Sequence, residues 1–206
     1  MIARVNGWLR RIPVGPLYAV LLMPAVWWIW RGVTGRLGAD PVRALEQELG
    51  LFALQLLIAA LAVTPLREVT GLSFVRFRRC IGLTAFWYAC LHLLAWIWLD
   101  RQFDGARIVE DLTRRPYVIL GMSAFLMLLP LAATSSDAAI RRLGGPRWRR
   151  LHRLAYPATA LAAAHFVWLV KAWPPEPLAY AAGVAALILY RLLPRRGRIR
   201  SFARAA

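Results

Sequence analysis

The chain has 206 residues, of which 60% are hydrophobic and ten are tryptophan, and its mean hydropathy is positive. This composition excludes an ordinary soluble core and is typical of a polytopic membrane protein. The formal net charge is +17, but a basic protein binds nucleic acid only when its cations gather on one accessible face. The placement of the cations along the chain is therefore more informative than their number.

Six apolar stretches have the length of a membrane-spanning helix, which is about 20 residues. They predict an all-α fold, a bundle of six transmembrane helices that forms a single domain over residues 1–206. The expected helices cover residues 14–30, 49–65, 81–99, 117–133, 154–171 and 177–193.

The basic residues predict the orientation of this bundle. With the N-terminus in the cytoplasm, 19 of the 27 lysines and arginines fall in cytoplasmic segments and eight fall outside. Because cytoplasmic loops carry the excess of Lys and Arg, both termini are expected in the cytoplasm. The surplus arginines suit anionic lipid headgroups, so membrane lipids and not nucleic acid are the predicted partners. Arg10-Arg11 precedes an apolar run without a cleavage pattern, so the first helix is expected to stay uncleaved.

Short sequence motifs predict the structure of the connections between these helices. The second helix is expected to stop at Thr64-Pro65, and a short helix is expected to start near Asp104. A short basic helix is expected at 138–143, closed by Gly144. The link at 172–177 is short and proline-rich, so the last two helices should form a hairpin.

Two of the three histidines lie inside predicted spans, and this is the main functional signal. His92 and His165 each lie 11 residues past the start of their helices, at Ile81 and Leu154. Since both helices run from inside to outside, the two imidazoles should reach the same depth. An ionisable side chain in the membrane is by default a functional-site hypothesis. Two imidazoles at one depth can ligate one haem iron from opposite faces.

Other roles for the histidines stay open at this stage. Each could be a core histidine that is hydrogen-bonded to a neighbour, whereas a zinc site lacks a third ligand at that depth. His152 lies at the cytoplasmic mouth of the fifth helix, 13 residues before His165. It can be one ligand of a second haem or a solvated interfacial residue. The corresponding position on the third helix, 14 residues before His92, is Arg78.

Arginines cluster at the inner ends of the two histidine-bearing helices. Their guanidinium groups can pair with haem propionates or with a flavin phosphate, and would favour the reduced, more negative cofactor. The alternative is that they satisfy only topology and lipid headgroups. The predicted cofactor-binding residues are Arg76, Arg78, Arg79, Arg149 and Arg150.

Several motifs, taken in order and with their spacing, resemble a known family. The chain is similar to the haem-binding membrane subunit of the bacterial periplasmic methionine-sulfoxide reductase system, within the ferric-reductase-like transmembrane group. The resemblance covers most of Leu49 to Lys171. It is carried by Thr64-Pro-Leu-Arg67, Arg76-Phe-Arg-Arg-Cys-Ile-Gly-Leu83, Tyr88-Ala-Cys-Leu-His92-Leu-Leu-Ala95, Arg114-Arg-Pro-Tyr117, Leu129-Pro-Leu-Ala-Ala-Thr-Ser-Ser136, Trp148-Arg-Arg-Leu-His152-Arg-Leu-Ala-Tyr156 and His165-Phe-Val-Trp168.

The resemblance implies a b-type haem, a flavin mononucleotide and a place in the bacterial inner membrane. It implies that electrons come from a cytoplasmic flavin reductase or from quinone. They would pass to a periplasmic molybdopterin-containing methionine-sulfoxide reductase that repairs oxidised proteins. The wider group carries two histidines on each of two helices, whereas this chain has three in all. The fourth ligand of a second haem is therefore missing from the pattern.

The sequence is thus consistent with three functions. The first is an electron-transfer subunit with no catalytic residues of its own. The second is a self-contained ferric or oxygen reductase, against which we note that the 206 residues hold no fused FAD and nicotinamide domain. The third is a transporter with a histidine relay, but the sequence shows no inverted repeats or broken helices in matching positions.

Overall fold

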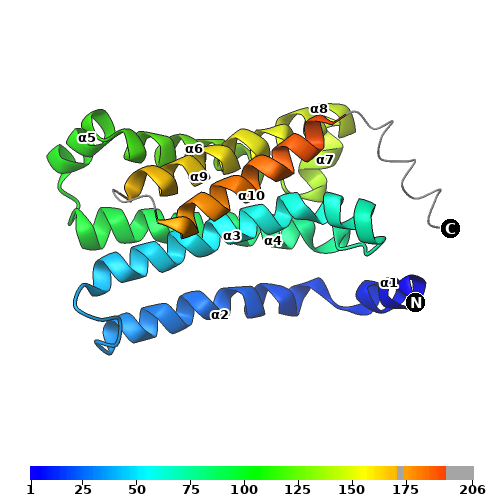
Figure 1. Ribbon diagram of the computed structural model, residues 1–206, viewed down its shortest axis with the longest axis horizontal. Helices are drawn as coiled ribbons and strands as arrows, with labels where there is room; N and C mark the ends of the chain where they lie inside the picture. The colour runs from blue at the N-terminus through cyan, green and yellow to red at the C-terminus, as the bar shows by residue number, and fades with distance from the viewer. Residues whose placement is uncertain (171–173, 194–206) are drawn as a thin grey trace.

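The computed structural model describes residues 1–170 and 174–193. Within these ranges the regular structure is helical throughout (Figure 1). The end of the predicted fifth helix at Lys171, part of the link at 172–177 and the tail from 195 onward lie outside the described residues. The elements are α1 (Ile2–Arg11), α2 (Val14–Val33), α3 (Pro41–Thr70), η1 (Val75–Phe77), α4 (Arg78–Ala95), η2 (Trp96–Asp100), α5 (Gly105–Arg114), α6 (Pro116–Ala133), α7 (Asp137–Leu143), α8 (Gly145–Leu151), η3 (His152–Leu154), α9 (Ala155–Leu169) and α10 (Pro175–Leu192).

Four segments of the described chain are long and apolar enough to cross a membrane. They are Val14–Val33, Pro41–Thr70, Val75–Asp100 and Pro116–Ala133. The predicted fifth and sixth helices correspond to α9, which has 15 residues, and α10, which has 18 and carries Glu176 and Arg191 in its end turns. The protein is therefore all-α with four candidate spans. The six-span count and the orientation stay predictions.

Helix α3 is longer than the sequence predicts. It begins at Pro41 because Asp40 caps it, accepting a hydrogen bond from the backbone N–H of Arg43 at 3.0 Å. It also runs through Pro65 to Gly71, whose φ of 75° ends it in the left-handed region. The expected stop at Thr64-Pro65 was wrong. A proline removes only one backbone donor, and residues that follow it, such as Leu66 and Arg67, have a high helix propensity.

The connections gather at two ends of the bundle. Helix α5 lies at one end, and α1, α7 and α8 lie at the other (Figure 1). Asp104 accepts from the N–H groups of Ala106 and Arg107 and so starts α5 where the sequence predicts a short helix. Ser136 caps α7 in the same way, but Gly145 opens the additional helix α8, which the sequence analysis did not foresee.

Two helix pairs form the centre of the fold. Helix α3 packs along α4, and α6 packs along α9, while α10 covers α9 and α3 and α2 covers α4 and α3. The deepest side chains include Leu49 of α3, Tyr88 of α4 and Thr159 of α9. Large apolar side chains such as Met23, Trp87 and Leu126 are more than half exposed on the outside. Such a surface suits contact with lipid.

Tyr88 is hydrogen-bonded to the backbone of α2 next to a proline. Pro24 lies inside that helix. The hydroxyl of Tyr88 accepts from the N–H of Ala25 at 3.0 Å and donates to the carbonyl of Leu21 at 2.8 Å. Ala25 and Leu21 are four positions apart, so the side chain bridges two backbone groups on either side of the proline. This contact ties α2 to the helix that carries His92.

Candidate functional site

His92 and His165 face each other from different helix pairs. His92 comes from α4 and His165 from α9. Their ring centroids are 6.3 Å apart, and the ring planes cross at 75°. Two imidazoles on opposite sides of one metal, each bonded at about 2.0 Å, would have ring centres about 6 Å apart. The equal depth predicted from the sequence therefore brings the two rings to a spacing that suits one shared iron.

The hydrogen bonds of the two rings fix their tautomers. Nδ1 of His92 lies 2.8 Å from the backbone oxygen of Glu46, and Nδ1 of His165 lies 2.7 Å from that of Tyr117. Because a carbonyl oxygen only accepts, each Nδ1 must carry the proton and donate it. Nε2 of each ring is then the unprotonated nitrogen, which is the form that ligates a metal.

A glycine makes room for each imidazole. A Cβ added to Gly50 would lie 3.0 Å from Nδ1 of His92, and one added to Gly121 would lie 2.9 Å from Nδ1 of His165. Each glycine follows the residue whose carbonyl accepts the hydrogen bond by four positions, which is one helical turn. The α3–α4 and α6–α9 pairs thus use the same device to seat one histidine each.

The two histidines line a cavity of about 640 Å³, a size within the range of small-molecule and cofactor sites. Apolar side chains, including Leu54, Leu57, Phe125 and Leu128, form much of its wall. Its charged lining residues are Asp40, Arg43, Glu46, Asp100, Arg101 and Arg115. All of them come from the start of α3, the end of η2 or the residue before α6, so one end of the cavity is polar and the rest is apolar.

The donor set fits a haem better than a bare metal ion. Among the described residues there is no group of three or more His, Cys, Asp or Glu side chains placed to hold a metal ion. Two imidazoles with free Nε2 atoms, set at the right spacing in an apolar cavity, are sufficient for a porphyrin, which supplies the other four iron ligands itself.

His152 does not line this cavity and lies just before the start of α9. Its Nε2 is 3.0 Å from Oγ1 of Thr134, and its ring stacks on Trp148 with centroids 3.9 Å apart. Burial, followed by the positive charge of Arg78, lowers the pKa of His152 below its usual range. The ring is therefore neutral at pH 7. The structure brings Arg78 near His152, and no second imidazole faces it.

The five predicted arginines do not form one cluster. Arg78 is partly buried, and its Nη1 lies 3.5 Å from Oγ1 of Thr64. Arg79 instead pairs with Asp137 of α7, and Arg76 donates to the backbone oxygen of Arg10 at the end of α1. Arg149 and Arg150 lie on α8. Of these arginines, Arg78 is the one whose charge acts on His152.

Sequence reasoning missed the residues that orient the histidines. The carbonyls of Glu46 and Tyr117 and the glycines at 50 and 121 lie more than 40 positions before the imidazoles they serve. One signal in the sequence could have pointed to the glycines, because each histidine is preceded by a glycine at a similar distance along the chain. Gly50 precedes His92 by 42 residues, and Gly121 precedes His165 by 44.

Comparisons with known proteins show which family this chain belongs to. Residues 48–163 match the family model described as the ferric reductase like transmembrane component. The chain is 48% identical over 184 residues to the protein-methionine-sulfoxide reductase heme-binding subunit MsrQ of Brucella anthropi, covering 89% of this chain and 83% of the relative. It is 49% identical over 176 residues to the proteins of that name from Brucella ovis and Brucella suis, covering 85% of this chain and 80% of each relative.

The family model covers more than half of the chain, and these relatives are nearly half identical to it along most of its length. The chain therefore belongs to the MsrQ family, among the ferric reductase like transmembrane proteins.

Proposed function

We propose that this protein is an electron-transfer subunit that holds one b-type haem between His92 and His165 and serves a methionine-sulfoxide reductase partner. The observation that carries the proposal is the pair of imidazoles 6.3 Å apart with both Nδ1 atoms engaged by backbone carbonyls. The relatives are named as heme-binding subunits of that reductase. In this proposal the protein is a multi-pass protein of the bacterial inner membrane.

A haem with two axial imidazoles exchanges single electrons and has no open position for a substrate. The side chains of this protein supply the rest. The carbonyls of Glu46 and Tyr117 hold the proton of each ring on Nδ1 and leave Nε2 unprotonated, and hydrogen bonds of this kind raise the basicity of a ligating histidine. The apolar wall formed by residues such as Leu54 and Phe125 limits access of water.

We place electron entry at the opposite end, where Arg78, His152 and Trp148 meet. Arg78 offers a fork of donors to an anionic group, and Trp148 already stacks on the ring of His152. This environment supports a flavin mononucleotide or another anionic carrier more than a second haem, since an arginine stands where an opposing ligand would be needed. A cytoplasmic flavin reductase or the quinone pool would deliver the electrons. A periplasmic molybdopterin-containing reductase would receive them.

The proposal can be tested in proteoliposomes. Reduced flavin is added outside, and a membrane-impermeant one-electron oxidant is trapped inside. We expect the trapped oxidant to be reduced by vesicles that hold the wild-type protein and not by vesicles that hold His165→Ala. Gly183→Ala is the matched control, because a Cβ added to that glycine would meet no neighbouring atom within 4 Å. Equal reduction by wild type and His165→Ala would contradict the proposal, whereas rapid oxygen consumption without a partner would favour a self-contained oxygen reductase.

A further inference from the structure

The charged residues that line the cavity shared by His92 and His165 all lie at one end of it. Among the cavity-lining residues, the arginines are Arg43, Arg101 and Arg115. None of them is near Leu57 or Leu128, which lie in the middle of α3 and α6. A haem has two ionised propionates on one edge of an otherwise apolar ring. Burying carboxylates in the apolar end would be costly, so that edge must face the arginines.

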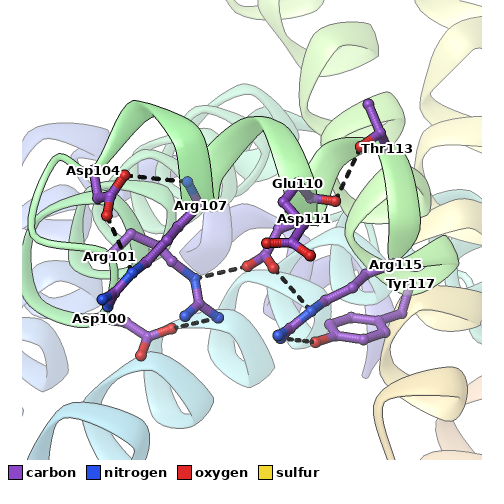
Figure 2. Close-up of polar contacts among 9 residues, drawn as sticks. All are labelled: Asp100, Arg101, Asp104, Arg107, Glu110, Asp111, Thr113, Arg115 and Tyr117. Atoms are coloured by element: carbon purple, nitrogen blue, oxygen red, sulfur yellow. Dashed lines mark hydrogen bonds and ion pairs between the residues drawn. The ribbon is translucent and has the colours of Figure 1, made fainter.

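Two of these arginines, Arg101 and Arg115, pair with a buried carboxylate of α5, that of Asp111 (Figure 2). The side chain of Asp111 is 4% exposed and lies 2.7 Å from Nε of Arg101 and 2.8 Å from Nε of Arg115. The N–H of Arg101 is not aligned for a hydrogen bond to Asp111, so charge attraction dominates that contact. Asp111 is also the one buried residue of α5. Burial of a carboxylate is tolerated only when cations compensate it.

The geometry leaves donors of both guanidinium groups uncommitted. Nη2 of Arg101 lies 3.1 Å from Asp100, and Nη1 of Arg115 donates to the hydroxyl of Tyr117 at 3.0 Å. Among the described residues, Nη1 of Arg101 and Nη2 of Arg115 take part in none of these contacts. Both residues line the cavity that His92 and His165 share.

We propose that Arg101 and Arg115 bind the two haem propionates at the polar mouth of the cavity, and that Asp111 positions both guanidinium groups for this task. The inference rests on the haem proposed above. A guanidinium fork matches a carboxylate in shape and charge. Since a nearby cation favours the more negative reduced cofactor, the same two arginines raise the reduction potential of the haem.

The test uses the full-length protein with its haem, in detergent. The variants are Arg101→Gln and Arg115→Gln, and the matched control is Arg114→Gln. Arg114 neighbours Arg115, but its side chain is 79% exposed and pairs with Glu110 at 3.5 Å on the outer face. Spectroelectrochemical titration gives the midpoint potential, and resonance Raman gives the propionate bending bands. We expect both cavity variants to shift the potential negative and move these bands, while the control matches wild type.

The role of Asp111 is tested by the sign of the shift in Asp111→Asn. If the carboxylate positions the arginines, its loss lets them turn to solvent and the potential falls. If it acts only as a negative charge, its removal raises the potential, and that result would overturn the positioning role. Glu110→Gln is the control on the exposed face of the same helix.

A second measurement changes the ligand as well as the protein. Haem and haem dimethyl ester, which lacks ionised propionates, are loaded into protein made without haem, and loss to apomyoglobin is timed. We expect the ester to leave wild type about tenfold faster than haem does. The two should leave the Arg101→Gln/Arg115→Gln variant at similar rates. Equal rates from wild type would refute the propionate site and leave the His92–His165 haem standing, whereas failure of wild type to take up haem would sink both proposals.

Discussion

The imidazole of His165 lies so close to Gly121 that a methyl group on this glycine would come within 2.9 Å of Nδ1. Gly50 stands in the same relation to His92, at 3.0 Å. Each glycine lies in the helix that also supplies the carbonyl for the ring. The glycine lets the imidazole approach the helix, and the carbonyl fixes its tautomer. These positions are therefore part of the candidate haem site although they carry no side chain.

Gly50→Ala and Gly121→Ala are expected to weaken haem binding. The added methyl must push the imidazole from its carbonyl partner, and overpacking of this kind costs about 1–3 kcal/mol, or roughly five- to 150-fold in affinity. Haem content of the purified variants and the low-spin electron paramagnetic resonance signal give the measurement. Gly82→Ala is the control, because a Cβ added to that helical glycine would meet no neighbouring atom within 4 Å. Wild-type haem content and an unchanged signal in Gly121→Ala would show that the contact is unimportant.

Tyr88→Phe is expected to destabilise the protein by about 1–3 kcal/mol, because it leaves the N–H of Ala25 and the carbonyl of Leu21 unpaired in an apolar setting. Thermal unfolding in detergent, followed by circular dichroism, measures the loss. Tyr180→Phe is the comparison. It removes a single bond to the side chain of Gln55, which is only partly buried and can find another partner. Equal stability of the two variants would mean that the hydrogen bonds of Tyr88 to α2 stabilise the protein no more than the bond between Tyr180 and Gln55 does.

Arg78→Lys is expected to slow electron uptake from reduced flavin by roughly tenfold, since lysine keeps the charge but loses the guanidinium fork. Stopped-flow reduction of the haem by reduced flavin mononucleotide measures the rate. Arg76→Lys is the control, because Arg76 is directed to the backbone of Arg10 at α1. If both variants took up electrons at the wild-type rate with normal cofactor content, Arg78 would be a topology marker only.

The orientation rests on the cation distribution and is open to direct test. Alkaline phosphatase fused after Gly144 should be inactive, because the loop between α7 and α8 is expected in the cytoplasm. The same enzyme fused after Gly38, between α2 and α3, should be active. The reverse pattern of activity would overturn the predicted topology.

Sequence reasoning reached the pairing of His92 with His165 because depth along a helix follows directly from residue count. It could not reach Glu46, Gly50, Tyr117 or Gly121, because their contacts depend on the register between neighbouring helices, which tertiary packing sets. It also ended α3 too early. Thr64-Pro65 is a stop signal by residue type, but Pro65 removes only one backbone donor and the helix continues to Thr70.

The arginines of the inner face show the same limit. Composition and spacing predict a single basic site formed by Arg76, Arg78, Arg79, Arg149 and Arg150. The structure sends neighbouring side chains in different directions, since residues one apart on a helix do not share a face. Arg79 pairs with Asp137, while Arg78 turns toward Thr64. The packing of the helices, and not the residue type, therefore distinguishes the partly buried Arg78 from the other arginines.

The most direct test of the central proposal compares haem spectra of wild type, His92→Ala, His165→Ala and His152→Ala, purified in parallel. Reduced-minus-oxidised absorption and haem quantitation are measured on each. We expect a low-spin bis-histidine spectrum in wild type, loss of that haem in both His92→Ala and His165→Ala, and its retention in His152→Ala. A wild-type spectrum and haem content in His92→Ala and His165→Ala would contradict the proposed site.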